Sequence, residues 1–418
     1  MIQPPSAPRF PLQALSIAVA TARSNWLALA LLTAVSLLPA CAADQPAAHP
    51  PCVYFDGCPE AGDANGDGAI SDASDTTQTV IRVLDFSLDT QKGEVLKGDV
   101  TAGKIDQGAD KDPAVVGIQV KAAEGARSAR TLGRQRVGSG VVIDADGLVL
   151  TIGYLMLEAD QIEIITQDRK AVPAVAVAYD IATGFGLVKP LLPLRGVKPV
   201  PLGSMKGVRN GEPLMAATGA NTRGEDSDVS MTQLVSQRAF SGNWEYHLDN
   251  AIFTSPPVSA GSGNHSGAPL FNQQGELLGI GSLLVGDALG ENRRVPGNMF
   301  VPVDLLQPIL AELRKSGTSA QSRRPWLGLT STDQGGRVQI LRVNEESPAQ
   351  MAGLRAGDVV LAVDDVMVNS LALFYKQLWA RSAPDALVRL TVLQGAEIKV
   401  LQVTPQDRLL TLKRPSGI

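Results

Sequence analysis

The sequence predicts a mainly β protein from about residue 114 of its 418 residues onward. Apolar and polar residues alternate over 115–121 and 138–144, and Asp146-Gly147 between strand-like runs is a turn signal. Short β runs, regularly spaced, are typical of a β-barrel or sandwich domain. A short amphipathic helix is predicted after them, over 305–315. The further short β runs lie at 148–151, 162–166, 174–178, 186–189 and 213–219.

Length and composition set broad limits on the protein's class. A chain of this length is expected to form two or three domains. The hydrophobic content of 44% supports packed cores, and the net charge of −5 gives no reason to expect nucleic-acid binding. The chain has 3 His, widely spaced, so neither a metal-ligand cluster nor a cofactor is expected.

An apolar run over 26–38 characterises the N-terminus. Arg9 and Arg23 precede it and small residues follow, a pattern typical of an export signal. The run is shorter than the ~20 apolar residues that a spanning helix needs. Residues 1–42 are therefore predicted to be a signal peptide or lipoprotein signal, which directs the protein to a bacterial periplasm or envelope.

Three outcomes of that signal are considered. The run Leu-Pro-Ala-Cys at 38–41 resembles a bacterial lipobox, which would make Cys41 a lipidated first residue that anchors the protein to the membrane. Cleavage after Ala42 and retention of the run as a membrane anchor are the alternatives.

An acidic N-terminal extension is predicted over 43–112. Cys52 and Cys58 lie close together in it, and in an exported chain they are expected to form a small disulfide loop. Two free thiols are the alternative.

The same extension contains a candidate calcium loop. Oxygen ligands at Asp63, Asn65 and Asp67, followed by Gly68, resemble the opening of an EF-hand loop. Ser74 stands at the twelfth position, where such a loop has Glu, so an acidic, solvated turn is the alternative.

The candidate chemistry centres on Ser266, within Gly-Ser-Gly-Asn-His-Ser-Gly-Ala-Pro-Leu-Phe at 261–271. A loop of small residues lets backbone N–H groups point toward one hydroxyl. An acyl-transfer enzyme needs this arrangement, a nucleophile with oxyanion donors beside it. A Gly-rich turn between two strands is the alternative.

Further motifs resemble the trypsin-like proteases of the HtrA/Deg family, whose serine loop reads Gly-Asn-Ser-Gly-Gly-Pro-Leu. The resemblance covers roughly residues 114–405 and implies a trypsin-like double β-barrel over 113–315. The motifs follow the family's order: Gly-Ser-Gly-Val-Val-Ile-Asp at 138–144, Asp-Ile-Ala-Thr-Gly-Phe-Gly-Leu-Val-Lys at 180–189, the segment 202–221, and Asn-Met-Phe-Val-Pro-Val-Asp at 298–304.

After a polar linker over 316–324, residues 325–408 resemble a PDZ domain of the HtrA kind. The signature is Ser-Pro-Ala-Gln-Met-Ala-Gly-Leu-Arg-Ala-Gly-Asp-Val-Val at 347–360. The resemblance implies that loop N–H groups capture a peptide's terminal carboxylate while the peptide adds a strand to the sheet edge. The implied peptide-binding residues are Trp326, Leu327, Gly328 and Leu329 in the loop, and Leu371, Phe374 and Tyr375 on a helix.

Overlaying the motifs places Tyr154 where the family has its catalytic His and Gly184 where it has the orienting Asp, so only Ser266 of the triad is present. A neutral phenol with a pKa near ~10 cannot serve as the base near neutral pH. His265 and His247 are alternative bases, and a surface or structural role is the ordinary role for both.

The resemblance therefore implies an envelope pseudoprotease that binds unfolded proteins or peptide C-termini, in protein quality control or stress sensing. The alternative is an active serine endopeptidase of the HtrA type that uses Ser266 with an unorthodox base. Which peptides bind, and whether the chain forms the family's homotrimer, stay open.

Overall fold

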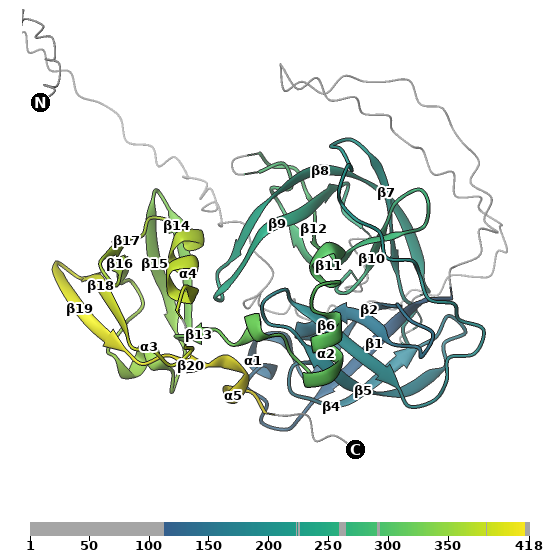
Figure 1. Cartoon of the computed structure of the whole chain (residues 1–418), viewed down its shortest axis with the longest axis horizontal. Coiled ribbons are helices and arrows are strands. Elements are labelled where there is room, and N and C mark those ends of the chain that lie inside the picture. The colour runs from purple at the N-terminus through teal and green to yellow at the C-terminus, as the bar shows by residue number, and fades with distance from the viewer. Residues whose placement is uncertain are drawn as a thin grey trace, which may run out of the picture. The chain divides into compact units, whose positions relative to one another are not determined.

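The computed structural model describes residues 113–222, 224, 226–258, 265–290, 293–381 and 383–413. The first strands close into a barrel, with strand order β1-β2-β3-β6-β5-β4 (Figure 1). The alternating run at the start of the β region forms its first strand, and Ile118 and Val120 point into the core. Its strands are β1 Val115–Ala122, β2 Gln135–Val142, β3 Val149–Ile152, β4 Ala159–Ile165, β5 Ala171–Tyr179 and β6 Phe185–Pro190.

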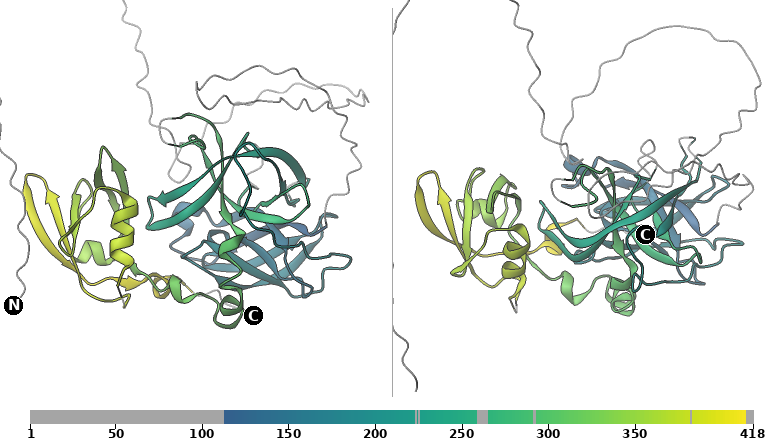
Figure 2. Two further views of the ribbon diagram at one scale, coloured as in Figure 1. Left: turned by 45° about the horizontal axis from the view of Figure 1, so that its top comes forward. Right: turned by 90° about the horizontal axis from the view of Figure 1, so that it is seen from above.

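A second barrel follows, with strand order β10-β11-β12-β9-β8-β7. Its longest strands, β8 and β9, continue beyond the barrel as a two-stranded ribbon, drawn in teal in Figure 2. Its strands are β7 Pro213–Thr218, β8 Asp228–Gly242, β9 Tyr246–Ser255, β10 Pro269–Phe271, β11 Leu277–Val285 and β12 Gly297–Pro302.

Short helices connect these strands. The helix predicted over 305–315 begins later, as α2 Leu310–Ser316, after the 3₁₀ turn η2 Val303–Leu305. Pro308 has no N–H to donate, so regular i→i−4 bonding starts only beyond it. Gly317, in the left-handed conformation, ends α2. The other short helices of this region are α1 Ala129–Leu132 and η1 Gly153–Met156.

The stretch predicted as a polar linker is held against the first barrel. It contains the 3₁₀ turn η3 Ala320–Ser322. The hydroxyls of Ser319 and Ser322 both donate to Oδ1 of Asp180, Ser319 at 2.5 Å, and all three residues are buried. This carboxylate fixes the point at which the chain leaves the barrels.

The C-terminal domain has a sheet of order β14-β15-β16-β18-β19, with β17 paired to β16, and a two-stranded pair β13-β20. Among the described residues, β14 has one strand neighbour in this sheet, β15. The elements are β13 Pro325–Trp326, β14 Leu329–Gln334, β15 Arg337–Val343, α3 Pro348–Met351, β16 Val359–Val363, β17 Val366–Met367, α4 Leu371–Trp379, β18 Val388–Gln394, β19 Glu397–Val403, β20 Gln406–Asp407 and α5 Arg408–Thr411.

The barrels and the C-terminal domain have separate hydrophobic cores. Phe185 and Phe253 are fully buried in the cluster of the barrels, and Phe374 in that of the C-terminal domain. Across the described ranges, no helix combines the length and apolar character needed to cross a membrane. The prediction of a mainly β, double-barrel protein is confirmed.

Candidate active site and peptide-binding groove

The candidate nucleophile lies where the two barrels meet. Ser266 is in the turn that leads into β10 of the second barrel, and its own carbonyl accepts a hydrogen bond from Ser139 N of the first barrel at 2.7 Å. Ser266 is buried, with 9% of the residue exposed. Tyr154, in η1 of the first barrel, places its phenol oxygen 2.6 Å from Ser266 Oγ. Tyr154 and Ser266, which the overlay of the motifs assigns to two positions of the family's triad, are therefore in direct contact.

A third group completes this contact. Tyr154 Oη also lies 2.7 Å from the backbone carbonyl oxygen of Ser282. The β11–β12 pairing is irregular at this point, between Gly281 and Leu283, which leaves this carbonyl free of the ladder. A phenol has one proton and a carbonyl only accepts, so Tyr154 donates to Ser282 and the Ser266 hydroxyl donates to Tyr154.

The phenol is a poor proton acceptor in this setting. Burial raises the pKa of Tyr154 to about 12, and the hydrogen bond with Ser266 opposes the shift only in part. Near neutral pH the phenol therefore keeps its proton. Ser266 faces a hydrogen-bond partner that does not remove its proton.

Gly184 contacts Gly153, the residue before Tyr154, but offers no side chain. Its carbonyl accepts from Gly153 N at 2.7 Å, and its φ is +87°, a conformation that side chains other than that of glycine rarely adopt. A Cβ built on Gly184 would lie 3.1 Å from Tyr246 Oη, which donates to Thr183 O at 2.6 Å. Tyr246 thus fills the space that an orienting carboxylate would need.

The two histidines considered as alternative bases, His247 and His265, lie in different surroundings. Both ring nitrogens of His247 are engaged within the β8–β9 ribbon: Nδ1 lies 2.9 Å from Ser241 Oγ and Nε2 lies 3.3 Å from Asp249 Oδ1. His265 directly precedes Ser266, its carbonyl accepts from Ala268 N at 3.1 Å, and burial lowers its pKa. His247 therefore takes part in a structural hydrogen-bond pair.

The residues implied in peptide binding lie in β13, in the loop before β14, at the start of β14 and in α4 of the C-terminal domain. Leu371 and Phe374 are buried in the core of that domain, and Trp326 is buried in β13. Tyr375 is also buried, yet its hydroxyl reaches out to donate to Gly242 O at 2.8 Å and to accept from Glu245 N at 3.2 Å. Tyr375 therefore faces the tip of the β8–β9 ribbon.

The loop before β14 holds a carboxylate in this structure. Glu245 Oε1 accepts from Leu327 N at 2.8 Å, and Oε2 accepts from Gly328 N at 3.0 Å and Leu329 N at 3.2 Å. Gly328 has a φ of +84°, which the turn of this loop requires. The three N–H groups that the sequence associates with a peptide's terminal carboxylate thus converge on a side chain of the same chain.

The sequence did not point to Glu245 as a functional residue. Glu245 ends the three-residue turn between β8 and β9, with φ +61°, where the left-handed conformation favours Gly or Asn. It is buried at 5% exposure, and this desolvation raises its pKa, opposed by the three N–H donors. The sequence feature that could have drawn attention to Glu245 is an acidic residue at a turn position where Gly or Asn is favoured.

Several predicted features lie outside the described residues. These are the signal, the lipidation candidate Cys41, the pair Cys52 and Cys58, and the calcium-loop candidates Asp63, Asn65 and Asp67. In the described ranges, no group of three or more His, Cys, Asp or Glu is arranged to hold a metal ion.

Comparisons with known proteins agree with the two-part fold. Residues 138–280 match the model of a trypsin-like peptidase domain and residues 325–404 match that of a PDZ domain. The chain therefore carries a trypsin-like peptidase domain followed by a C-terminal PDZ domain. Over 276 residues it is 26% identical to the serine endoprotease DegS of Haemophilus influenzae, which covers 65% of this chain and 77% of that protein. The chain is a homologue of the HtrA-type serine proteases DegS and DegP.

The extent of the match differs between relatives. DegS of Escherichia coli is 26% identical over 311 residues, covering 71% of this chain and 83% of that protein. A probable periplasmic serine endoprotease of the DegP-like kind from Pseudomonas putida is 29% identical over 243 residues, or 55% of this chain and 47% of that protein. The chain thus spans about half the length of this DegP-like relative.

Two solved structures are similar to this chain over most of its length. The HtrA-type protease AlgW with a tripeptide has 21% sequence identity and a TM-score of 0.44, and the match covers 73% of this chain and 95% of that one. A serine endoprotease from Yersinia pestis has 21% identity and a TM-score of 0.43, covering 71% and 94%.

Proposed function

We propose that this chain is a non-catalytic HtrA homologue that binds the C-termini of peptides or unfolded proteins through its PDZ domain. Its role is in quality control or stress sensing in the bacterial envelope. The single observation that carries the non-catalytic part is the 2.6 Å contact between Tyr154 Oη and Ser266 Oγ.

This contact supports the absence of peptide hydrolysis for a chemical reason. A serine hydroxyl is a weak nucleophile until a base removes its proton, and in the triad a third group orients that base. The group in contact with Ser266 is a phenol whose pKa is raised to about 12 by burial. At the third position, Gly184 supplies a backbone carbonyl and no carboxylate.

The peptide-binding part is supported by the loop at Leu327, Gly328 and Leu329. Its three N–H groups converge on both oxygens of one carboxylate, at 2.8 to 3.2 Å. A terminal carboxylate of a peptide presents the same two oxygens, and β14 has one strand neighbour in its sheet, so a peptide strand could pair with its other edge.

The location in the envelope is supported by two independent features. The N-terminal sequence has the pattern of an export signal. DegP-like relatives from Pseudomonas putida and Halomonas elongata are named periplasmic.

A lipid anchor on Cys41 is part of this proposal. Intact-mass analysis of the membrane-extracted protein tests it, since a mature chain that begins at Ala43 without lipid would refute the anchor.

Fluorophosphonate labelling tests the non-catalytic proposal directly. Purified protein should not label, with trypsin as a positive control under the same conditions, and it should not cleave casein. The matched variant Ser266→Ala removes the nucleophile. Labelling or casein cleavage that disappears in Ser266→Ala would overturn the proposal in favour of an active endopeptidase with an unorthodox base.

A further inference from the structure

We infer that the tip of the β8–β9 ribbon is an internal ligand of the PDZ groove, and that Glu245 takes the place of a peptide's terminal carboxylate. The inference rests on the proposed peptide-binding function of that groove. It adds that a free C-terminus and this ribbon compete for the same N–H groups.

The carboxylate contacts are the first line of support. Glu245 accepts three backbone hydrogen bonds from the loop, and the side chain is almost fully buried there. Buried ionisable groups need partners of this kind, and hydrogen bonds to a charged acceptor are stronger than neutral ones. The loop therefore recognises the Glu245 carboxylate as a ligand, with every N–H group of Leu327, Gly328 and Leu329 engaged.

The backbone of the ribbon provides the second line. Asn243 O, two residues before Glu245, accepts from Ser331 N at 2.9 Å. Ser331 belongs to β14, whose outer edge is unpaired in the sheet order. A peptide that adds a strand to this edge would offer a carbonyl to the same N–H group. The ribbon tip thus satisfies the groove with both a side chain and a main-chain contact.

Contacts on the other wall hold the tip in place. From α4, Tyr375 Oη bridges Gly242 O and Glu245 N, and Lys376 forms an ion pair with Asp249 of β9. Helix α4 and strand β14 are the two walls between which the tip lies. The tip is therefore bound along the groove rather than only at its carboxylate end.

The turn itself is shaped for this contact. A three-residue turn commonly ends in a left-handed residue, a position that Gly or Asn occupies with less strain than Glu. Glu245 occupies it at φ +61°. In that conformation its side chain reaches Leu327 N, a group 82 positions along the chain. The cost of the backbone conformation is offset by the three hydrogen bonds that the Glu245 carboxylate accepts there.

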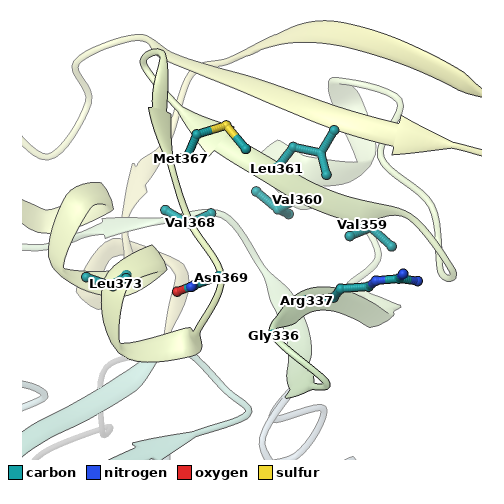
Figure 3. A pocket seen from close by; sticks show the side chains of 9 residues that line it. All are labelled: Gly336, Arg337, Val359, Val360, Leu361, Met367, Val368, Asn369 and Leu373. Carbon is teal, nitrogen blue, oxygen red and sulfur yellow. The ribbon is translucent and has the colours of Figure 1, made fainter. Parts of the chain in front are cut away.

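A separate pocket of the PDZ domain supplies a control position. Figure 3 shows the residues that line this hollow, which come mainly from β15, β16 and β17 and include Leu373 of α4. Its volume is about 310 Å³. Its lining includes Met367, which is 71% exposed. None of its lining residues makes the hydrogen bonds to Glu245. Met367→Ala therefore changes the PDZ surface without touching the contacts of the ribbon.

Fluorescence anisotropy on the full mature chain tests the competition. The probe is one labelled peptide with an apolar last residue, made as the free acid and as the C-terminal amide. Glu245→Gln keeps the size of the side chain and removes its charge, so the free acid should bind at least tenfold more tightly to this variant than to the wild type. Asp249→Asn removes the ion pair with Lys376 that helps to hold the same tip, so it should also raise the affinity, whereas Met367→Ala should change the affinity much less.

The outcomes separate the two proposals. Equal affinity of wild type and Glu245→Gln for the free acid, with the acid preferred over the amide in both, overturns the internal ligand and leaves peptide binding intact. No preference for the acid in either protein overturns the proposed peptide-binding function.

Hydrogen exchange tests the internal ligand without any peptide. The amides of Leu327, Gly328 and Leu329 should be protected in the wild type and should exchange at least tenfold faster in Glu245→Gln, while β18 stays protected in both. Saturating free-acid peptide should speed exchange in the 242–246 turn of the wild type. Unchanged protection of the loop in a folded Glu245→Gln variant overturns the inference, and Glu245→Ala provides a second variant if Gln impairs folding.

Discussion

Tyr154 and Ser266 join the two barrels through a 2.6 Å contact between their hydroxyl oxygens. Tyr154 comes from η1, directly after β3, and Ser266 from the turn before β10. In an active serine protease the corresponding contact passes a proton from nucleophile to base. Under the proposed non-catalytic function both hydroxyls keep their protons near neutral pH, and the contact contributes to stability at the barrel interface.

The stability of the two hydroxyl variants should differ in a defined order. Tyr154→Phe removes the donor of the Ser282 carbonyl and the acceptor of Ser266, so it should lower the free energy of unfolding by about 1–3 kcal/mol. Ser266→Ala leaves the Tyr154–Ser282 bond in place and should cost about 1 kcal/mol or less. Urea unfolding of both variants measures this. A larger loss in Ser266→Ala would contradict the assigned directions of the hydrogen bonds.

Alkaline pH should weaken the fold through Tyr154. Its pKa is about 12 in the folded protein, against ~10 when unfolded, so the unfolded chain loses this proton first. The contribution of this phenol to the free energy of unfolding is on the order of 2–3 kcal/mol. It is complete below about pH 10 and is lost as the pH rises from about 10 to 12. Urea unfolding at pH 9, 10 and 11 should show a shallower decline for Tyr154→Phe than for the wild type. Equal slopes would show that this phenol titrates alike in both states.

Gly184 should resist replacement for two separable reasons. Gly196, with φ +73° and no atom within 4 Å of a built Cβ, reports the backbone strain alone. Gly184→Ala adds the contact with Tyr246 Oη and should cost about 1 kcal/mol more than Gly196→Ala, by thermal or urea unfolding. Gly184→Asp should cost more again. Tyr154→His combined with Gly184→Asp should therefore not yield fluorophosphonate labelling, and labelling of that double variant would refute this steric account.

Gly328→Val should abolish the preference for a free C-terminus. A Cβ at Gly328 would lie 2.4 Å from Ser347 Cβ, and Ser347 caps α3 by accepting from Gln350 N. The displaced loop should no longer bind the free acid more tightly than the amide. The preference that is lost should amount to at least ~1.5 kcal/mol, the low end for a hydrogen bond to a charged group. The matched control is Gly353→Val, which has the same φ of +84° with open space around it. Anisotropy in the Glu245→Gln background measures both, and an intact preference in Gly328→Val would contradict the role of this loop.

Local patterns were sufficient to predict most of the fold. Alternation over 115–121 gave β1, and the signature at 347–360 identified the C-terminal domain, because both depend on neighbours in the chain. The start of α2 was misplaced, since the apolar spacing gives no weight to the missing N–H of Pro308. The order of the motifs placed Tyr154 at the position of the family's catalytic His, and the structure adds that its phenol contacts Ser266.

The contacts of Glu245 could not be predicted from the sequence. The residue belongs to a short turn between two β runs, and the partners of its carboxylate lie 82 to 84 positions further along. Nothing in the turn specifies that its tip meets β14 and α4. That meeting depends on how far the ribbon extends beyond the barrel and on where Asp180 fixes the chain between the domains.

A ligand carried on the same chain sets a threshold for any competitor. Tethered groups act at effective concentrations on the order of mM, and a site that is free about 1% of the time binds about a hundredfold more weakly than its intrinsic constant. A peptide with intrinsic micromolar affinity would then half-fill the groove only near 100 μM. With Glu245 in the groove, the PDZ domain would bind few free C-termini when their concentration is low, and it would become occupied only when free C-termini accumulate.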